Sequence, residues 1–146
     1  MRPDPARVLM GLTSKLALTV AADCRTPFGQ TTAGHAAALT MVLAQEVDRL
    51  PDRLYRETEA VSAILEDALP LLDRTLAARV RETLANRTSP DLRISSLQAA
   101  NDAVRAVLVD VHAAVEALDS AAARAMNERI WDELRESTRR RHVVMA

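Results

Sequence analysis

Residues 95–118, SSLQAANDAVRAVLVDVHAAVEAL, are the stretch that decides the fold. Ser95 and Gln98 have the spacing of a capping box, which predicts that a helix begins there. Apolar side chains then recur at steps of three and four residues, so they gather on one face of that helix. They are Leu97, Val104, Val107, Leu108, Val111, Val115 and Leu118. We expect this face to be buried and this helix to be the centre of the fold.

A stripe of four polar side chains flanks that apolar face: Asn101, Arg105, His112 and Glu116. Their spacing confines them to about 60° of the helix circumference. One interpretation is a structural seam, in which Arg105 or His112 pairs with Glu116 or with a carboxylate on a neighbouring helix. The alternative is a ligand site between helices, where Arg105 would bind a carboxylate or phosphate and His112 would titrate near neutral pH. Asn101 and Glu116 would then orient the ligand.

A metal site is a third interpretation of the same stripe. His112 and Glu116 lie one helical turn apart and could share an ion, with His35 as a further ligand. Di-iron sites in helical bundles, however, use two Glu-x-x-His pairs. None of His35, His112 and His142 has an acidic residue three positions before it. We therefore expect neither a metal nor another cofactor.

Other chemistry-bearing signals are few. Cys24 is the only cysteine, so it forms no intrachain disulfide and no zinc motif, which favours the cytoplasm. The sequence has no phosphate-binding loop and no Gly-x-Ser-x-Gly motif. Arg139–Arg141 is a single basic run and is typical of a helix C-terminus, and with a net charge of -1 we expect no nucleic-acid partner. No catalytic residue is assigned.

Composition predicts helix almost everywhere. The 146 residues include only 3 glycines and 2% aromatic residues, while alanine, leucine and arginine dominate. No uninterrupted apolar run approaches the roughly 18 residues of a membrane span. A chain of this length can bury one core without disulfides. We predict a single domain over residues 1–146, an all-α antiparallel bundle of about five helices.

The N-terminal half is predicted to contain two helices. Asp4 and Pro5 are a cap and first position for a helix ending near Asp23. Residues 24–32 contain Pro27 and Gly29 and are interpreted as a loop, with Phe28 tucked against the bundle. Thr31 or Thr32 would cap the second helix. Its predicted core face is Ala36, Leu39, Val42, Leu43, Val47 and Leu50, and its small residues Ala33, Gly34, Ala37 and Ala38 would let a partner helix pack closely.

Two prolines and one turn divide the rest of the chain. Pro51 should end the second helix or bend it sharply, so that a third helix begins after it, and Pro70 should kink or restart that helix. Residues 86–91, NRTSPD, are predicted to be an exposed turn. Asp119 or Ser120 would cap the last helix. In that helix Met126, Ile130 and Leu134 would face inward, with Trp131 as an anchor.

The segments DLRISSLQAANDAVRAVLVDVHAAVEAL (91–118) and IWDELRESTRRR (130–141) resemble a group of small uncharacterised bacterial all-helical proteins, often encoded beside acyl-CoA dehydrogenases. The resemblance covers about half of the chain and transfers no active-site residue. It implies at most an accessory link to acyl-CoA metabolism.

We expect a cytoplasmic homo-oligomer that acts as an interaction or accessory protein without catalytic machinery of its own, because small and apolar residues cover more than one face of its helices. A protein partner is expected and a membrane is not. The alternative is a binder of an anionic, acyl-CoA-related small molecule, or an enzyme, that uses the polar stripe.

Overall fold

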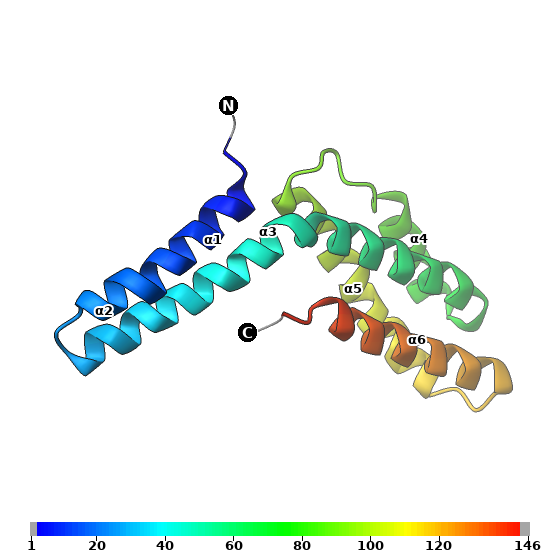
Figure 1. The fold of residues 1–146 in the computed structure, drawn as a ribbon. Coiled ribbons are helices and arrows are strands. Elements are labelled where there is room, and N and C mark those ends of the chain that lie inside the picture. The colour runs from blue at the N-terminus through cyan, green and yellow to red at the C-terminus, as the bar shows by residue number, and fades with distance from the viewer. Residues whose placement is uncertain (1–2, 144–146) are drawn as a thin grey trace. The chain divides into compact units, whose positions relative to one another are not determined.

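All the regular elements of residues 3–143, the part of the chain that the computed structural model describes, are helices (Figure 1). They are α1 (Pro5–Lys15), a π-helical segment (Leu16–Val20), α2 (Ala21–Asp23), α3 (Pro27–Ala68), a 3-10 turn (Leu69–Leu71), α4 (Arg74–Ala85), α5 (Ile94–Glu116) and α6 (Ala121–Arg140). The predicted all-α fold of about five helices is confirmed. No helix among these residues is both long and apolar enough to cross a membrane.

The chain divides into two compact units, and the boundary lies within α3 between Leu50 and Pro51. Residues 3–50, the hairpin unit, contain α1, α2 and the first part of α3; Val143 groups with them. Residues 51–142, the bundle unit, contain the rest of α3 with α4, α5 and α6. Two compact units can still fold together as one domain, so the predicted single domain over residues 1–146 stays a prediction.

The first helical run of the hairpin unit begins and ends where the sequence predicts. The Asp4 carboxylate accepts hydrogen bonds from the backbone N–H of Ala6 at 3.0 Å and of Arg7 at 3.4 Å. Helical structure continues to Asp23, although Leu16–Val20 is π-helical. Just before that segment the hydroxyl of Thr13 donates to the Leu9 carbonyl at 3.0 Å, a contact that competes with regular helix geometry.

The predicted loop over residues 24–32 is wrong for most of its length, because α3 already begins at Pro27. The Thr26 hydroxyl accepts from the Gly29 backbone N–H at 3.1 Å, and Pro27 fills the first helical position. Neither Thr31 nor Thr32 is the cap. Phe28 does not pack against the other helices as predicted, since it is 82% exposed.

The predicted core face of the second helix is wrong at Leu39 and Leu43, and its other four members are half-buried rather than buried. Leu39 and Leu43 are exposed, whereas Ala33, Ala37 and Ala44 are buried. The expected close packing of small residues is confirmed for Ala33 and Ala37, whereas Gly34 is exposed and Ala38 is only half-buried. A helix in a two-helix hairpin has a single neighbour, so only one of its faces is covered, and here that face is the alanine face.

Pro51 does not end α3, which continues unbroken to Ala68. Proline removes one backbone donor, and α3 accommodates this loss in its interior. The prediction that a separate helix begins after Pro51 is therefore wrong. Pro70 lies in the 3-10 turn, and helix restarts at Arg74, where the Asp73 carboxylate accepts from the Leu76 N–H at 2.8 Å. The predicted restart at Pro70 is confirmed.

The core of the bundle unit joins four helical segments (Figure 1). Among its most deeply buried side chains are Leu65 of α3, Val80 of α4, Val104 and Val111 of α5, and Ile130 of α6. The predicted apolar face of α5 is confirmed except for Leu118, which is 41% exposed. A core built from every helix of the unit explains why this half follows its hydrophobic pattern closely.

Local start signals in the bundle unit give a mixed outcome. The capping box is wrong, because α5 begins at Ile94 and the Gln98 amide donates to Asp102 at 2.7 Å. The Ser120 cap of α6 is confirmed, since its hydroxyl accepts from the Ala123 N–H at 3.1 Å. Trp131 is 45% exposed and is only a partial anchor. The predicted turn at 86–91 is present.

Candidate functional site

The four polar residues singled out on α5 do not form one site; they join three separate groups. Asn101 is buried, and its amide donates to the Thr58 hydroxyl of α3 at 3.3 Å. That hydroxyl in turn donates to the Leu54 carbonyl at 2.8 Å. Asn101 is therefore a cross-link between two helices.

Arg105 belongs to a second group, centred on a carboxylate that sequence reasoning missed. Glu57 of α3 is fully buried. Its Oε1 accepts from the Ser137 hydroxyl at 3.0 Å, and its Oε2 accepts from Arg141 Nη2 at 2.7 Å. Arg105 Nη1 lies 3.7 Å from Glu57 Oε2 and donates to the Ser137 hydroxyl at 3.3 Å. We call Glu57, Arg105, Ser137 and Arg141 the Glu57 cluster.

The Glu57 cluster stabilises a buried negative charge. Burial raises the pKa of Glu57, but the hydrogen bonds from Arg141 and Ser137 and the charges of Arg141 and Arg105 outweigh it, so the pKa lies below its ordinary value. Two guanidinium groups and one hydroxyl satisfy both carboxylate oxygens. The interaction predicted for a structural seam, Arg105 with a carboxylate of another helix, is therefore present.

A signal for Glu57 was available in the sequence. It lies three residues after Leu54 and four before Val61, a spacing that places it on the same helix face as these two apolar residues. A charged residue at such a position requires partners. Those partners lie 80 and 84 residues further along the chain, at Ser137 and Arg141, and no periodicity identifies them.

A second carboxylate of the bundle unit has its pKa shifted in the opposite direction. Glu133 of α6 pairs with Arg140. Burial raises its pKa more than the Arg140 charge and hydrogen bond lower it, and the negative charge of Glu57 adds to the rise. Charging Glu133 is thus less favourable in the folded protein than charging Glu57.

His112 and Glu116 form the third group. His112 Nε2 lies 2.7 Å from Asn127 Oδ1 and 3.4 Å from Glu116 Oε1. Because both neighbours are acceptors, Nε2 carries the proton in this arrangement. The imidazole also meets the Trp131 ring edge to face, with centroids 5.3 Å apart. Protein groups therefore already contact the Nε2 atom of His112.

The space beside Arg105 and His112 is small. A cavity of about 110 Å³ lies there, bounded also by Leu108, Ile130 and Leu134. Binding sites for drug-sized molecules usually measure about 300–1,000 Å³. The arrangement favours the structural interpretation of the stripe, and its use as a ligand site stays a prediction.

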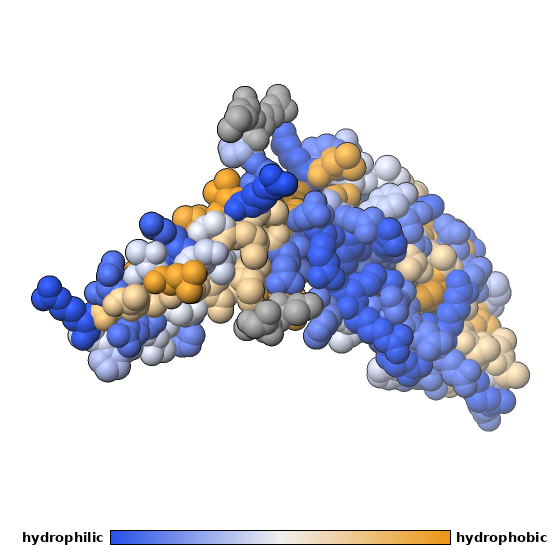
Figure 2. All heavy atoms as spheres, in the orientation of Figure 1, coloured by the Kyte–Doolittle hydropathy of each residue, from blue (hydrophilic) through white to orange (hydrophobic). Residues whose placement is uncertain are grey.

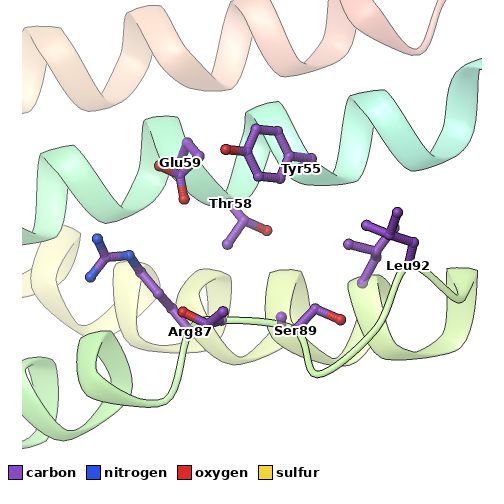
Figure 3. Close-up of a pocket in the computed structure, with 9 residues that line it drawn as sticks. Tyr55, Thr58, Glu59, Arg87, Ser89 and Leu92 are labelled. Atoms are coloured by element: carbon purple, nitrogen blue, oxygen red, sulfur yellow. The ribbon is translucent and has the colours of Figure 1, made fainter.

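A larger cavity, of about 240 Å³, lies where α3 faces the segment after α4 (Figure 3). Tyr55 and Glu59 come from α3, and Arg87 and Leu92 from that segment. Arg87 Nη1 is already engaged, by the Leu84 carbonyl at 3.2 Å and by Glu66 at 3.4 Å. Leu92 is 85% exposed, so this wall of the cavity is open to solvent.

No three His, Cys, Asp or Glu side chains within residues 3–143 are grouped so that they could hold a metal ion. His112 and Glu116 are adjacent, as the metal interpretation requires, but no third ligand of these types joins them.

The hairpin unit carries a different kind of candidate surface, in which three large apolar side chains lie beside two uncharged or weakly basic polar ones. On α3 the residues Phe28, Thr32, His35, Leu39 and Leu43, which we call the α3 stripe, fall within about 80° of the helix circumference. All five are exposed. Figure 2 shows orange and tan side chains along this unit, whereas blue predominates over the visible face of the bundle unit.

Comparisons with protein families, with curated proteins and with solved structures found no match. The resemblance to proteins encoded beside acyl-CoA dehydrogenases therefore stays a prediction.

Proposed function

We propose that this protein is an interaction or accessory protein, in which the bundle unit is a compact body and the hairpin unit presents the binding surface. The observation that carries the proposal is the exposure of the α3 stripe. Phe28 is 82% exposed, Leu39 66% and Leu43 57%. Apolar surface of this extent commonly marks a site of protein interaction.

The hairpin unit buries few side chains, so little burial energy offsets the cost of exposing its large apolar residues. Of residues 3–50, the buried ones are three alanines, Ala33, Ala37 and Ala44. Fully burying a leucine or phenylalanine side chain stabilises a protein by roughly 1.5–3 kcal/mol, and an alanine methyl contributes far less. A two-helix hairpin with an alanine core therefore needs further cover for its apolar side chains, and a bound protein supplies it.

The bundle unit supports the same proposal. Its buried charge, Glu57, is satisfied by Arg141, Ser137 and Arg105, so the cluster has the properties of a structural cross-link between helices. A cytoplasmic location and an accessory link to acyl-CoA metabolism remain part of the proposal on sequence grounds alone.

Native affinity purification from the source cells tests this function. The variant Leu39→Glu/Leu43→Glu places charges on the α3 stripe, and Leu92→Glu is the matched control, an exposed leucine of the bundle unit. We expect the wild type and the control to retain the same bound chains and the double variant to lose them. Identical bound chains in all three samples would contradict the proposal.

Small-molecule binding is a second candidate, because the cavity beside Tyr55 and Glu59, at about 240 Å³, has room for a molecule smaller than a typical drug. The version based on Asn101, Arg105, His112 and Glu116 has less support, because these side chains pair within the protein. Native mass spectrometry of the purified protein tests both versions, since it detects a retained ligand as added mass. A spectrum that shows only whole multiples of the chain mass, after gentle purification, would count against this candidate.

A further inference from the structure

We propose that the partner of the α3 stripe is a second copy of this chain, and that two hairpin units pack against each other through their α3 helices. This inference rests on the proposed function and names its partner. Each copy would contribute two helical rods, residues 5–23 and the first part of α3. Three features of the hairpin unit support a second copy.

The first feature is the presence of two packing faces on α3. The α3 stripe lies on one side of the helix, and Ala33, Ala37 and Ala44 lie roughly opposite. The alanine face is already buried. A helix with apolar side chains on two opposite sides packs against a different neighbour on each side. Phe28, Leu39 and Leu43 supply such side chains on the side away from the alanine face.

The second feature is the absence of charge. Residues 26–45 contain no Asp, Glu, Lys or Arg, and residues 8–22 contain only Lys15. In a two-fold symmetric dimer the same patch meets itself, so any charge near the axis faces a like charge. This surface avoids that repulsion. It also offers no charge pattern by which a differently charged protein would be selected.

The third feature is the available area. Three side chains of the α3 stripe are large and apolar, and Phe28, Leu39 and Leu43 are 82%, 66% and 57% exposed. Five further large apolar residues, on the helical run before α3, are at least 40% exposed: Val8, Met10, Leu12, Leu18 and Val20. Because these five are spread around that run, only some of them share a side with the stripe. The stripe therefore supplies the apolar centre of an interface, whose usual size is about 800 Å² on each partner.

The test is the molar mass of the full-length protein by light scattering across low to high micromolar concentration. We expect twice the chain mass of 16.0 kDa for the wild type. Leu39→Glu/Leu43→Glu should weaken the dimer by about 100-fold or more, because two side chains central to the interface become charged. Leu92→Glu and Val109→Glu are controls at exposed apolar positions of the bundle unit and should remain dimeric.

Phe28→Ser keeps the test valid if the double variant does not fold, because Phe28 lies in the first turn of α3 and is 82% exposed. It should weaken the dimer by about 10-fold, with helix content unchanged by circular dichroism.

The outcomes separate this inference from the proposed function. A wild type that is monomeric at every concentration overturns the second copy. The proposed function still stands if its stripe-dependent chains co-purify from cells, and it falls as well if they do not. A dimer that persists in Phe28→Ser and in the double variant uses another surface, and that result also overturns the inference.

Discussion

The bundle unit and the hairpin unit are built from similar amphipathic helices, yet they bury different residues. In the bundle unit Leu65, Val104 and Ile130 are fully enclosed, because each helix has neighbours on several sides. In the hairpin unit Leu39 and Leu43 remain exposed, and alanines are buried in their place. The number of neighbouring helices, rather than the hydrophobic pattern alone, decides which face of a helix becomes core.

The comparison extends to charged groups. The bundle unit buries Glu57, which pairs with the half-buried Arg105 and the exposed Arg141, whereas no charged side chain is buried among residues 3–50. A buried ion pair requires surroundings that hold all its partners in place. Only a unit with several packed helices offers them, so we expect the variants with the largest effects to lie in the bundle unit.

The largest expected effect is that of Glu57→Ala. Removing the carboxylate leaves Arg105 and Arg141 partly buried beside one another without their anion, which should cost roughly 3–5 kcal/mol of unfolding free energy. Urea denaturation measures this cost. Glu59→Ala, an exposed glutamate on the same helix, is the control and should leave the midpoint unchanged. A midpoint for Glu57→Ala equal to that of the control would contradict a structural cluster.

Leu65→Ala and Leu39→Ala test the difference between the two units directly. Leu65 is fully buried, so its truncation should cost roughly 2–5 kcal/mol. Leu39→Ala should have a small effect when measured at dilutions where the protein is monomeric. Equal losses in urea midpoint under those conditions would show that the hairpin unit is covered by its own chain.

Arg105→Ala should have a smaller effect, of roughly 1–3 kcal/mol, because Glu57 keeps Ser137 and Arg141 as partners. The loss should appear as a lower urea midpoint. An unchanged midpoint would instead favour the ligand interpretation, and His112 and Glu116 would be the next positions to test.

The smallest expected effect is the pH dependence that Glu57 contributes. Its folded pKa lies below the ordinary value of 4.5, so the unfolded state binds the proton more readily. The stability from Glu57 is thus present above pH 4.5 and is lost as the pH falls through the lower folded pKa. Urea midpoints of the wild type and Glu57→Gln should therefore converge on acidification. A constant difference between them would contradict this linkage.

Glu133 should behave in the opposite sense, since its folded pKa is raised. The folded state binds its proton more readily, so the stability it contributes is present at low pH and decreases as the pH rises through the raised pKa. Glu133→Gln should therefore improve relative to wild type as the pH rises past 4.5. Measuring both variants over the same pH series separates the two groups.

The candidate site was only partly predictable from sequence. The position of Arg105 beside an apolar face identified it as a residue that needs a carboxylate, and that carboxylate is Glu57. A shared helix edge was not enough to bring the four polar residues of α5 into one site. They are Asn101, Arg105, His112 and Glu116. Residues eleven positions apart on a helix, as Asn101 and His112 are, lie about 16 Å apart along its axis, so each contacts different neighbours.

The sequence by itself determined that the chain is helical and where several of its helices begin, because these signals act within a few residues of the chain. Asp4 and Ser120 cap their helices through hydrogen bonds to backbone groups two or three residues away, so these caps do not depend on the tertiary fold. The spacing of the apolar residues in α5 likewise places them on one face of the helix in any fold. Only the tertiary structure decided that the alanine face of α3 is buried and that Glu57 is enclosed by residues more than 45 positions away. These outcomes depend on which helices become neighbours, and burial energies act between segments distant in sequence.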